Sequence, residues 1–437
     1  MMIKLKAIGK DINLITSFIN SKVRPTDFSR DVLILLTGTS IAQLIPVIIT
    51  PIITRLFAPG DLGILTTFIS ITTLWGAFVN TRYDLAILQP EKDEDALNIT
   101  VLSISLTVIL TAVISFLLIF FSSYLTAYTS IFDAKYFLFI FPLTVILAGA
   151  SQALRYFNIR IKAFKDISKS NINKSIGLGV SNISLGVLQL GANGLVISQI
   201  LSNLAGNSIL FYNIKKRFTA EQISFESIKS AARKYINFPK YTMAGEILYS
   251  FNQNMINLFI LNYFNSIILG NYSLVMRLLG FPMQLIGLSI GDVFFQRIME
   301  EKKITGFAKN CFNVTFKKLL FISLLIFPLI YLFMEFYFTP LFGSNWQEAS
   351  SIGQIILFSV SIRFIVSPLA KIVFAFEKQK INLLWQLSMT LTMLISFYVT
   401  FLLKLDIKTF IIFITIVLII NDLLLLFISW LISRNKL

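Results

Sequence analysis

The chain has 437 residues, of which 56% are hydrophobic and 14% are charged. Soluble globular proteins carry about 25% charged residues, so this composition excludes a water-soluble fold and indicates an integral membrane protein. The net charge of +16 would suggest a nucleic-acid partner in a soluble protein, but a membrane protein acquires such an excess from Lys and Arg in its cytoplasmic loops, so no nucleic acid is expected.

Two residue types limit the chemistry of the chain. Cys311 is the single cysteine, which excludes an internal disulfide. Histidine is absent, which removes the commonest metal ligand and the commonest general base. We therefore expect no metal site and no Ser-His-Asp triad. No Gly-rich phosphate loop for ATP is present in the sequence, and we expect no cofactor.

Apolar segments of membrane-spanning length follow one another along the chain. A span needs roughly 20 mainly apolar residues. The sequence predicts twelve spans, at 32–54, 62–81, 97–121, 136–157, 174–192, 194–213, 241–262, 270–294, 314–337, 352–375, 382–403 and 409–431. The fifth span is rich in Gly, Ser and Asn, so we expect it to pack against other helices or to line a cavity.

Lys and Arg gather on alternate connecting segments. The segments 1–31, 214–240 and 434–437 are basic, whereas the loops 122–134 and 338–351 contain neither Lys nor Arg. Basic loops stay in the cytoplasm, so both termini are predicted to be cytoplasmic. Every loop on the opposite side is short, which leaves no room for an outer catalytic domain, and we expect a protein that is not an enzyme.

The segment after the second span reads NTRYDLAILQPEKDEDA (80–96) and places Arg82, Tyr83 and Asp84 where the chain emerges on the cytoplasmic side. One interpretation is an interfacial anchor with an Arg–Asp pair, because Arg binds lipid phosphates and Tyr favours the interface. The other is a cytoplasmic gate, or the point where a substrate enters. The acids at 91–95 precede the third span, where they favour the helix dipole.

Two parts of the sequence repeat at an offset of about half the chain. RLFAPGDLGILTTF (55–68) matches NYFNSIILGNYSLVMR (262–277) at offset 207, and SQALRYF (151–157) matches SVSIRFI (359–365) at offset 208. The first match pairs Gly63 with Gly270, and the second pairs Arg155 with Arg363. Coincidence among apolar segments is the alternative. The common offset favours two homologous six-helix bundles, parallel because six is an even number.

This repeat divides the chain into five parts. They are a cytoplasmic segment 1–31, a bundle 32–213, an amphipathic cytoplasmic linker 214–240, a second bundle 241–433 and a cytoplasmic tail 434–437. The linker is expected to lie along the membrane surface, to act as a hinge, or both. Transporters built in this way bind substrate at the interface between the repeats.

Ionisable side chains inside spans are costly and often mark function. The cations are Arg155, Arg277, Arg363 and Lys371, and the carboxylates are Glu246 and Asp292. One hypothesis is a cationic cavity for an anionic group such as pyrophosphate, which a guanidinium binds through two parallel hydrogen bonds. The alternative is a set of structural ion pairs, for example Arg277 with Glu246 or Asp292. Lys135 and Asp422 are predicted to lie at span ends, where long side chains reach the interface.

Four stretches resemble the Wzx-type polysaccharide flippases, which transport O-antigen or capsule repeat units within the multidrug/oligosaccharidyl-lipid/polysaccharide exporter superfamily. They are LTGTSIAQLIPVIITPIITRLFAPGDLGILTTF (36–68), RYDLAILQPEKDEDA (82–96), LGNYSLVMRLLGFPMQLIGLSIGDVFFQRIMEE (269–301) and LFGSNWQEASSIGQIILF (341–358). The resemblance covers both halves in family order and is specific for this branch of the superfamily, but much less so for the substrate.

The resemblance implies a function. An oligosaccharide linked to undecaprenyl pyrophosphate would cross from the cytoplasmic to the outer face of a bacterial inner membrane by alternating access, with membrane lipids and other polysaccharide assembly proteins as partners. A proton or sodium gradient could drive transport through carboxylates such as Asp84, Glu246 or Asp292. The rival functions are a cation-coupled drug antiporter of the same superfamily, a membrane polymerase or ligase for lipid-linked sugars, and a scaffold that transports nothing.

Overall fold

The computed structural model describes residues 27–120, 134–217 and 222–435. The predictions for most of segment 1–31, for most of the loop 122–134 and for the Lys135 side chain lie outside the residues and side chains described. Within the described ranges every regular element is helical. The predicted all-α membrane fold is confirmed.

Each of the twelve predicted spans falls on a long helix. The first half forms α2 (Asp27–Leu56), α3 (Pro59–Val79), α4 (Tyr83–Ala86), α5 (Asp93–Phe120), α7 (Ala134–Arg160), α8 (Phe164–Val187) and α9 (Gly191–Arg217). The linker contains α10 (Phe225–Lys234) and the π-helical turn η2 (Phe238–Thr242).

The second half begins with α11 (Met243–Tyr263) and α12 (Ser266–Pro282), and the π-turn η3 (Met283–Gly287) joins α12 to α13 (Leu288–Thr305). The remaining elements are α14 (Lys309–Phe336), α15 (Phe338–Phe342), η4 (Ser344–Trp346), α16 (Gln347–Leu369), α17 (Ile372–Ala375), α18 (Gln379–Leu403) and α19 (Ile407–Ile432).

By length and composition, ten helical stretches of the described residues could cross a membrane, and the long helices α8 and α11 fall outside that set. The exact number of crossings therefore stays a prediction. α8 contains the polar fifth span up to Val187 and packs between α2 and α9. A side chain at Gly177 would meet Ala205 of α9, and one at Gly179 would meet Ile49 of α2. The expectation that this span packs against other helices is confirmed.

Local sequence explains where several helices begin and end. Pro59 occupies the first turn of α3, where no hydrogen bond of its backbone nitrogen is needed, and the Asp61 side chain accepts from the backbone N–H of Ala58. Asn265 caps α12 by accepting from the N–H of Ile268. Gly306, with φ of 76°, ends α13 in the left-handed conformation that glycine adopts without strain.

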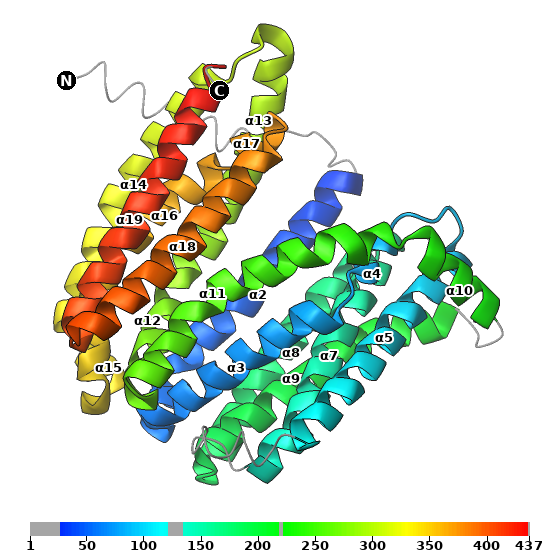
Figure 1. The fold of residues 1–437 in the computed structure, drawn as a ribbon, viewed down its shortest axis with the longest axis horizontal. Helices are drawn as coiled ribbons and strands as arrows, with labels where there is room; N and C mark the ends of the chain where they lie inside the picture. Colours follow the sequence, from blue (N-terminus) through cyan, green and yellow to red (C-terminus); the bar gives the residue numbers. More distant parts are fainter. Residues whose placement is uncertain (1–26, 121–133, 218–221, 436–437) are drawn as a thin grey trace.

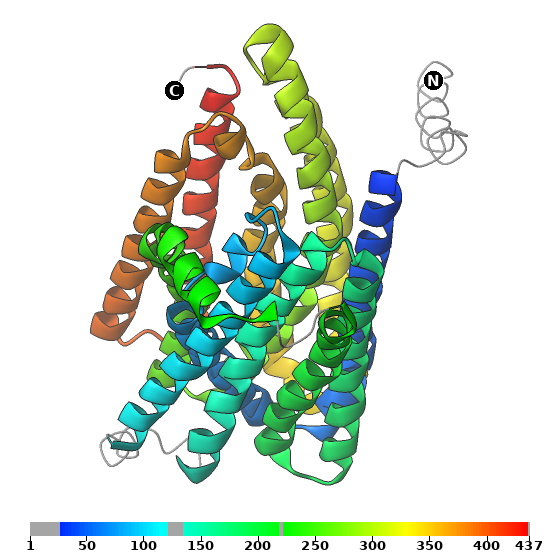
Figure 2. The same ribbon diagram turned by 90° about the vertical axis from the view of Figure 1, so that its right-hand side faces the viewer.

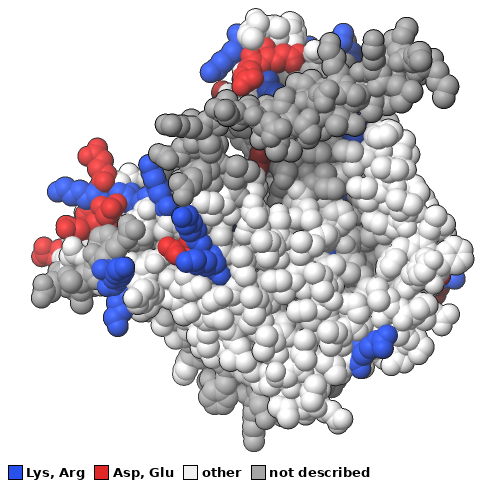
Figure 3. All heavy atoms as spheres, turned by 180° about the vertical axis from the view of Figure 1, so that it is seen from behind, with Lys and Arg blue, Asp and Glu red and all other residues white. Residues whose placement is uncertain are grey.

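Figure 1 shows two groups of helices, with α12–α19 on one side and α3–α9 on the other, and with α2 and α11 between them. The groups meet at the end that carries α15 and spread apart toward the end that carries α4, α10, α13 and α17 (Figures 1 and 2). The sequence predicts that the spread end faces the cytoplasm, so we refer to the predicted cytoplasmic end and the predicted outer end. On the face seen in Figure 3, charged side chains gather toward the edges, and a broad surface between them carries almost none.

The two groups touch most closely where α3 crosses α12 at the predicted outer end. A Cβ atom added to Gly63 would lie 2.7 Å from the carbonyl carbon of Ser266, and one added to Gly270 would lie 2.6 Å from that of Pro59. These distances leave no room for a side chain. The contact is reciprocal, because Gly63 and Pro59 are the repeat equivalents of Gly270 and Ser266 at offset 207.

A second contact closes the same end. Trp346 is the last residue of η4 and is completely buried, and its indole N–H donates to the Thr54 carbonyl oxygen of α2 at 2.9 Å. Buried Trp usually finds such a partner. Both halves of the chain are therefore joined at the predicted outer end by backbone packing and by a hydrogen bond.

The linker is attached to the first half. The Tyr83 hydroxyl donates to the carbonyl oxygen of Ala232 at 2.8 Å. The Asn98 side chain accepts from the N–H of Ser224 and donates to the carbonyl oxygen of Gln222. No residue of α10 is fully buried, so this helix lies on the surface at the predicted cytoplasmic end while its contacts hold it to α5.

Candidate functional site

A cavity of about 420 Å³ lies between the two halves, on the cytoplasmic side of the α3–α12 crossing. Helices α2, α7 and α8 of the first half and α12 with η3 of the second supply its walls. The lining residues are Thr39, Ala42, Gln43, Pro46, Val47, Arg155, Asn171, Lys174, Ser175, Met276, Arg277, Gly280, Phe281 and Gln284. A volume of this size is typical of a site for a small molecule or for part of a larger one.

The charge in this cavity has one sign. Arg155, Lys174 and Arg277 line it, and no carboxylate is among its described lining residues. None of the three forms an ion pair within the described part of the chain. Three cations without a counter-charge repel one another, and an anion bound between them would relieve that repulsion. The site is therefore chemically suited to an anion.

Neutral amides add hydrogen-bonding groups to the same walls. Gln43, Asn171 and Gln284 line the cavity, and the Gln43 side-chain oxygen is buried without a hydrogen-bond partner in the described structure. Such an oxygen usually accepts from a protein group, a water molecule or a ligand. Amides of this kind can both donate to and accept from the hydroxyl groups of a sugar.

Among the predicted cavity residues, the structure brings Arg155 and Arg277 together and places Arg363 and Lys371 elsewhere. Arg363 lies 3.8 Å from Asp422, and Lys371 contacts Asp292 at 2.5 Å. Lys174 joins the cavity instead. Lys174 was not among the predicted cavity residues, although it opens the polar fifth span, which was expected to pack on helices or line a cavity.

The ion pairs differ from those predicted. Arg277 pairs with neither Glu246 nor Asp292, and Glu246 lies 3.4 Å from Arg82. The prediction that Asp422 sits at a span end is wrong. Asp422 lies well inside α19, is 3% exposed and faces the interior of the second half.

The residues Arg82, Tyr83 and Asp84 form a contact point between elements at the predicted cytoplasmic end. Arg82 adopts the left-handed conformation with φ of 61°, which turns the chain between α3 and α4. Its guanidinium pairs with Glu246 at the start of α11, so the predicted Arg82–Asp84 ion pair does not form. The Tyr83 hydroxyl holds the linker through Ala232. These contacts link the first half, the linker and the second half.

Asp84 is 2% exposed, and this burial raises the pKa of its carboxyl group. The nearby Arg82 guanidinium lowers the pKa, and the Glu246 carboxylate raises it slightly. Burial also raises the pKa of the Tyr83 hydroxyl. A small polar pocket of about 170 Å³ lies beside Arg82 and Glu246.

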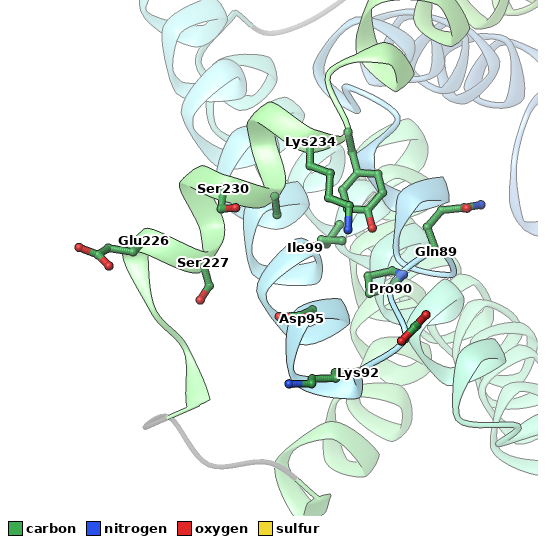
Figure 4. A pocket seen from close by; sticks show the side chains of 12 residues that line it. Gln89, Pro90, Lys92, Asp95, Ile99, Glu226, Ser227, Ser230 and Lys234 are labelled. Carbon is green, nitrogen blue, oxygen red and sulfur yellow. The ribbon is translucent and has the colours of Figure 1, made fainter.

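The acidic run at 91–95 borders a separate groove. Asp93 pairs with Arg160 at 2.7 Å, which fixes the start of α5 to the end of α7. The groove, of about 660 Å³, lies between this run and α10 (Figure 4). Side chains of both signs line it, with Lys92 and Asp95 on one wall and Glu226 and Lys234 on the other. All of its described lining residues belong to the first half and the linker, so it is not a route between the bundles.

Comparison with known proteins identifies relatives over most of the chain. Residues 52–351 match the family model described as polysaccharide biosynthesis protein. No curated protein matches the sequence significantly.

Solved structures of similar fold include a MOP superfamily transporter from Pyrococcus furiosus, 14% identical, with a TM-score of 0.62 over 94% of this chain and 96% of that one. That protein is described as having a binding pocket of reverse polarity, which suggests a different function. The lipid II flippase MurJ, in an inward closed conformation, is 18% identical with a TM-score of 0.59, covering 91% and 90%. The Vibrio cholerae MATE transporter VcmN is 14% identical with a TM-score of 0.55, covering 93% and 95%. The fold is therefore shared with this superfamily, as the resemblance implied.

Proposed function

The chain belongs to the polysaccharide biosynthesis protein family, and on that basis we propose that it is a flippase for an oligosaccharide carried on undecaprenyl pyrophosphate. It would move the sugar and diphosphate from the cytoplasmic to the outer face of a bacterial inner membrane, for assembly of a surface polysaccharide such as O-antigen or capsule. The observation that carries the proposal is the cationic cavity shared by both halves.

The physical obstacle to this reaction is charge. A hydrated anionic head group must pass about 30 Å of hydrocarbon. Arg155 and Lys174 from the first half and Arg277 from the second supply positive charge at the place where the anion would lose water. A diphosphate accepts paired hydrogen bonds from guanidinium groups, whose planar geometry matches phosphate oxygens. The amides of Gln43, Asn171 and Gln284 would contact the first sugar, and the lipid tail would remain in the bilayer.

The arrangement of closures supports alternating access. The contacts of Gly63 with Ser266 and of Trp346 with Thr54 lie between the cavity and the predicted outer end. The helices spread apart toward the predicted cytoplasmic end (Figure 1). This is the conformation in which a transporter receives a substrate made in the cytoplasm. Export would require the outer contacts to separate.

The cavity also separates this proposal from its closest rival. A drug antiporter that binds organic cations needs carboxylates near its substrate, and the cavity presents none among its described lining residues. At the predicted cytoplasmic end, Glu246 is paired with Arg82, and Asp84 lies outside the spans. Cation binding in this cavity would therefore be opposed by three positive charges.

The test uses a strain deleted for the gene of this chain and asks on which membrane face the lipid-linked oligosaccharide accumulates. Rescue is attempted with the wild type, with the double variant Arg155→Gln, Arg277→Gln, and with Arg297→Gln, which removes an exposed arginine of α13 outside the cavity. We expect accumulation on the cytoplasmic face, cured by the wild type and Arg297→Gln but not by the double variant at equal membrane abundance. Normal translocation in the deleted strain would reject the proposal.

A further inference from the structure

A stripe of buried polar residues runs along α19, away from the cavity. Thr415, Asp422 and Ser429 are spaced by seven residues, which places them on one face of the helix. Their residues are 4%, 3% and 0% exposed. With a rise of about 1.5 Å per residue, the stripe extends about 21 Å along the helix, most of the thickness of the hydrocarbon core.

Each residue of the stripe has a side-chain oxygen without a hydrogen-bond partner in the described structure. These are the hydroxyl oxygens of Thr415 and Ser429 and the Oδ2 atom of Asp422. The other buried hydroxyls of the described second half have a carbonyl partner, either on their own helix, as Thr400 bonds to Ser396, or on another, as Ser350 of α16 bonds to Met334 of α14. Buried polar oxygens nearly always have a partner, so three on one stripe point to a partner that is not a protein group.

Asp422 forms a long ion pair with Arg363. The distance from its Oδ1 atom to Arg363 is 3.8 Å, which is longer than a hydrogen bond. It lies ten residues before the end of α19 at Ile432, or about 15 Å from that end. A buried carboxylate whose second oxygen is unbonded is costly as an anion, and taking up a proton removes that cost. The site is arranged for a group that changes its charge.

The groups packed around Asp422 are few. Helix α16 contributes the charged group Arg363. Helix α12 contributes Tyr272, which is buried near the Arg363 guanidinium. From α18, Trp385 and Thr392 bond the neighbouring Asn421, and neither is titratable near neutral pH. Lys371, at the start of α17, is bound by Asp292. Among the described residues, Arg363 is therefore the charged group that controls Asp422.

The equivalent helices of the first half are joined by neutral groups. Ser151 on α7 donates to the Asn207 side-chain oxygen on α9. Arg155, the repeat equivalent of Arg363, has no acidic partner in the described part and lines the cavity. A charged pair between these helices is therefore peculiar to the second half, and the repeat symmetry of the fold does not require it.

We propose that Asp422 is the proton-binding group that couples transport to a proton gradient, with Thr415 and Ser429 as the polar groups past which a proton would reach it from the two membrane faces. This inference rests on the proposed transport function and adds its energy source. A metal cation is the wrong ligand, because Arg363 repels it and because oxygens about 10 Å apart along the helix cannot bind one ion together. A proton can pass between such oxygens through water.

The proposed step moves one proton and no electrons. Asp422 takes a proton from water on one side of the membrane and forms an O–H bond at Oδ2. Arg363 then loses its counter-charge and can change its position between α16 and α12. When the proton leaves to water on the other side, the Arg363–Asp422 pair forms again. The sequence suggested three other carboxylates for this role, Asp84, Glu246 and Asp292. All three lie toward the predicted cytoplasmic end, where Asp84 is buried in α4 outside the spans and the Asp292 side chain is 71% exposed.

The first experiment needs no substrate. Infrared difference spectra between low and high pH are recorded on the purified protein in lipid, for the wild type, Asp422→Asn and the control Asp292→Asn. We expect a band of a protonated, buried carboxyl group that the wild type and Asp292→Asn share and that Asp422→Asn lacks. The same band in Asp422→Asn would overturn the proposal. The buried Asp84 carboxyl group gives a band of its own, which the variant Asp84→Asn identifies. Because Asp422→Asn leaves Arg363 without a partner, the double variant Asp422→Asn, Arg363→Gln serves as a second test with the same expected loss.

The second experiment separates this proposal from the flippase proposal. Vesicles with the reconstituted protein and an undecaprenyl-diphosphate-linked sugar are tested with and without a pH gradient. We expect the gradient to speed wild-type transport several-fold, and expect Asp422→Asn to keep slow downhill transport without a response to the gradient. A full response in Asp422→Asn would overturn the coupling role and leave the flippase proposal intact. Failure of the wild type to transport the probe at all would reject the flippase proposal, while the infrared result would still decide whether Asp422 binds a proton.

Discussion

Replacing either glycine of the α3–α12 crossing should push the protein toward an outward-open conformation. In Gly63→Ala or Gly270→Ala the new Cβ atom would lie 2.7 or 2.6 Å from a carbonyl carbon of the other helix, whereas ordinary contacts begin at 3.4 Å. The carbonyl oxygens of Ser266 and Pro59 would lie closer still, so the helices must separate by more than about 0.7 Å at this point. Overpacking of this kind costs about 1–3 kcal/mol, and it burdens only the conformation in which the helices touch.

A cost of about 1.4 kcal/mol would shift the equilibrium toward outward-open molecules about tenfold. The shift can be read with the native cysteine replaced (Cys311→Ser) and with Val47→Cys as a reporter on the cavity wall. A membrane-impermeant maleimide added from the outer side should label this reporter several-fold faster in Gly63→Ala and Gly270→Ala than in the parent, per folded molecule.

The chain offers a matched control on each of the two helices. A Cβ atom at Gly76 of α3 or at Gly280 of α12 would meet nothing within 4 Å. Gly76→Ala and Gly280→Ala should therefore label at the parent rate. Equal labelling of the crossing variants and these controls would show that the α3–α12 contact does not open during transport, and the reasoning about closure at this end would be wrong.

Three further predictions follow from single side chains. Lys174→Gln should slow transport of the lipid-linked sugar severalfold in reconstituted vesicles, whereas Lys169→Gln, which removes a surface lysine of the same helix, should leave the rate unchanged. Trp346→Phe removes the hydrogen bond to Thr54 and should lower the free energy of unfolding by about 1 kcal/mol, against about 3–5 kcal/mol for Trp346→Ala, measured by thermal unfolding in detergent. Burial raises the pKa of Asp84 in the folded state above its value in the unfolded chain. The residue therefore contributes stability at a pH below its unfolded pKa, and this stability is lost as the pH rises through its folded pKa. Asp84→Asn should flatten the fall of melting temperature above about pH 4, and an unchanged pH profile would contradict this.

The membrane spans could be predicted because insertion into a membrane requires apolar segments. A helix that crosses hydrocarbon must be apolar over about 20 residues, and that signal is local in the sequence. The repeat was also accessible, and its Gly63–Gly270 match proved to be a reciprocal contact between the halves. The polar fifth span predicted a helix that packs against other helices, and α8 packs against α2 and α9.

The partners of charged residues could not be predicted in this way, because they depend on how helices rotate against one another. Asp422 was predicted to lie at a span end, but it lies ten residues before the end of α19, and the structure buries it near Arg363 of α16. Arg82 looked like a partner for Asp84, but the left-handed turn at Arg82 directs it to Glu246 instead. Sequence distance says little about pairs of this kind.

Arg155 and Arg363 occupy equivalent positions of the repeat but have different surroundings. Arg155 is free to face an anion, whereas Arg363 is held by Asp422. The first half can therefore bind an anion while the second half binds a proton. Helix α12 lies between these sites, since Arg277 on it lines the cavity and Tyr272 lies near Arg363. The same helix carries Gly270 at the outer crossing, seven residues before Arg277 and therefore on the same face. If α12 moves when Arg363 is released, both the cavity and the outer contact change. The two proposals therefore require this helix to move as one body.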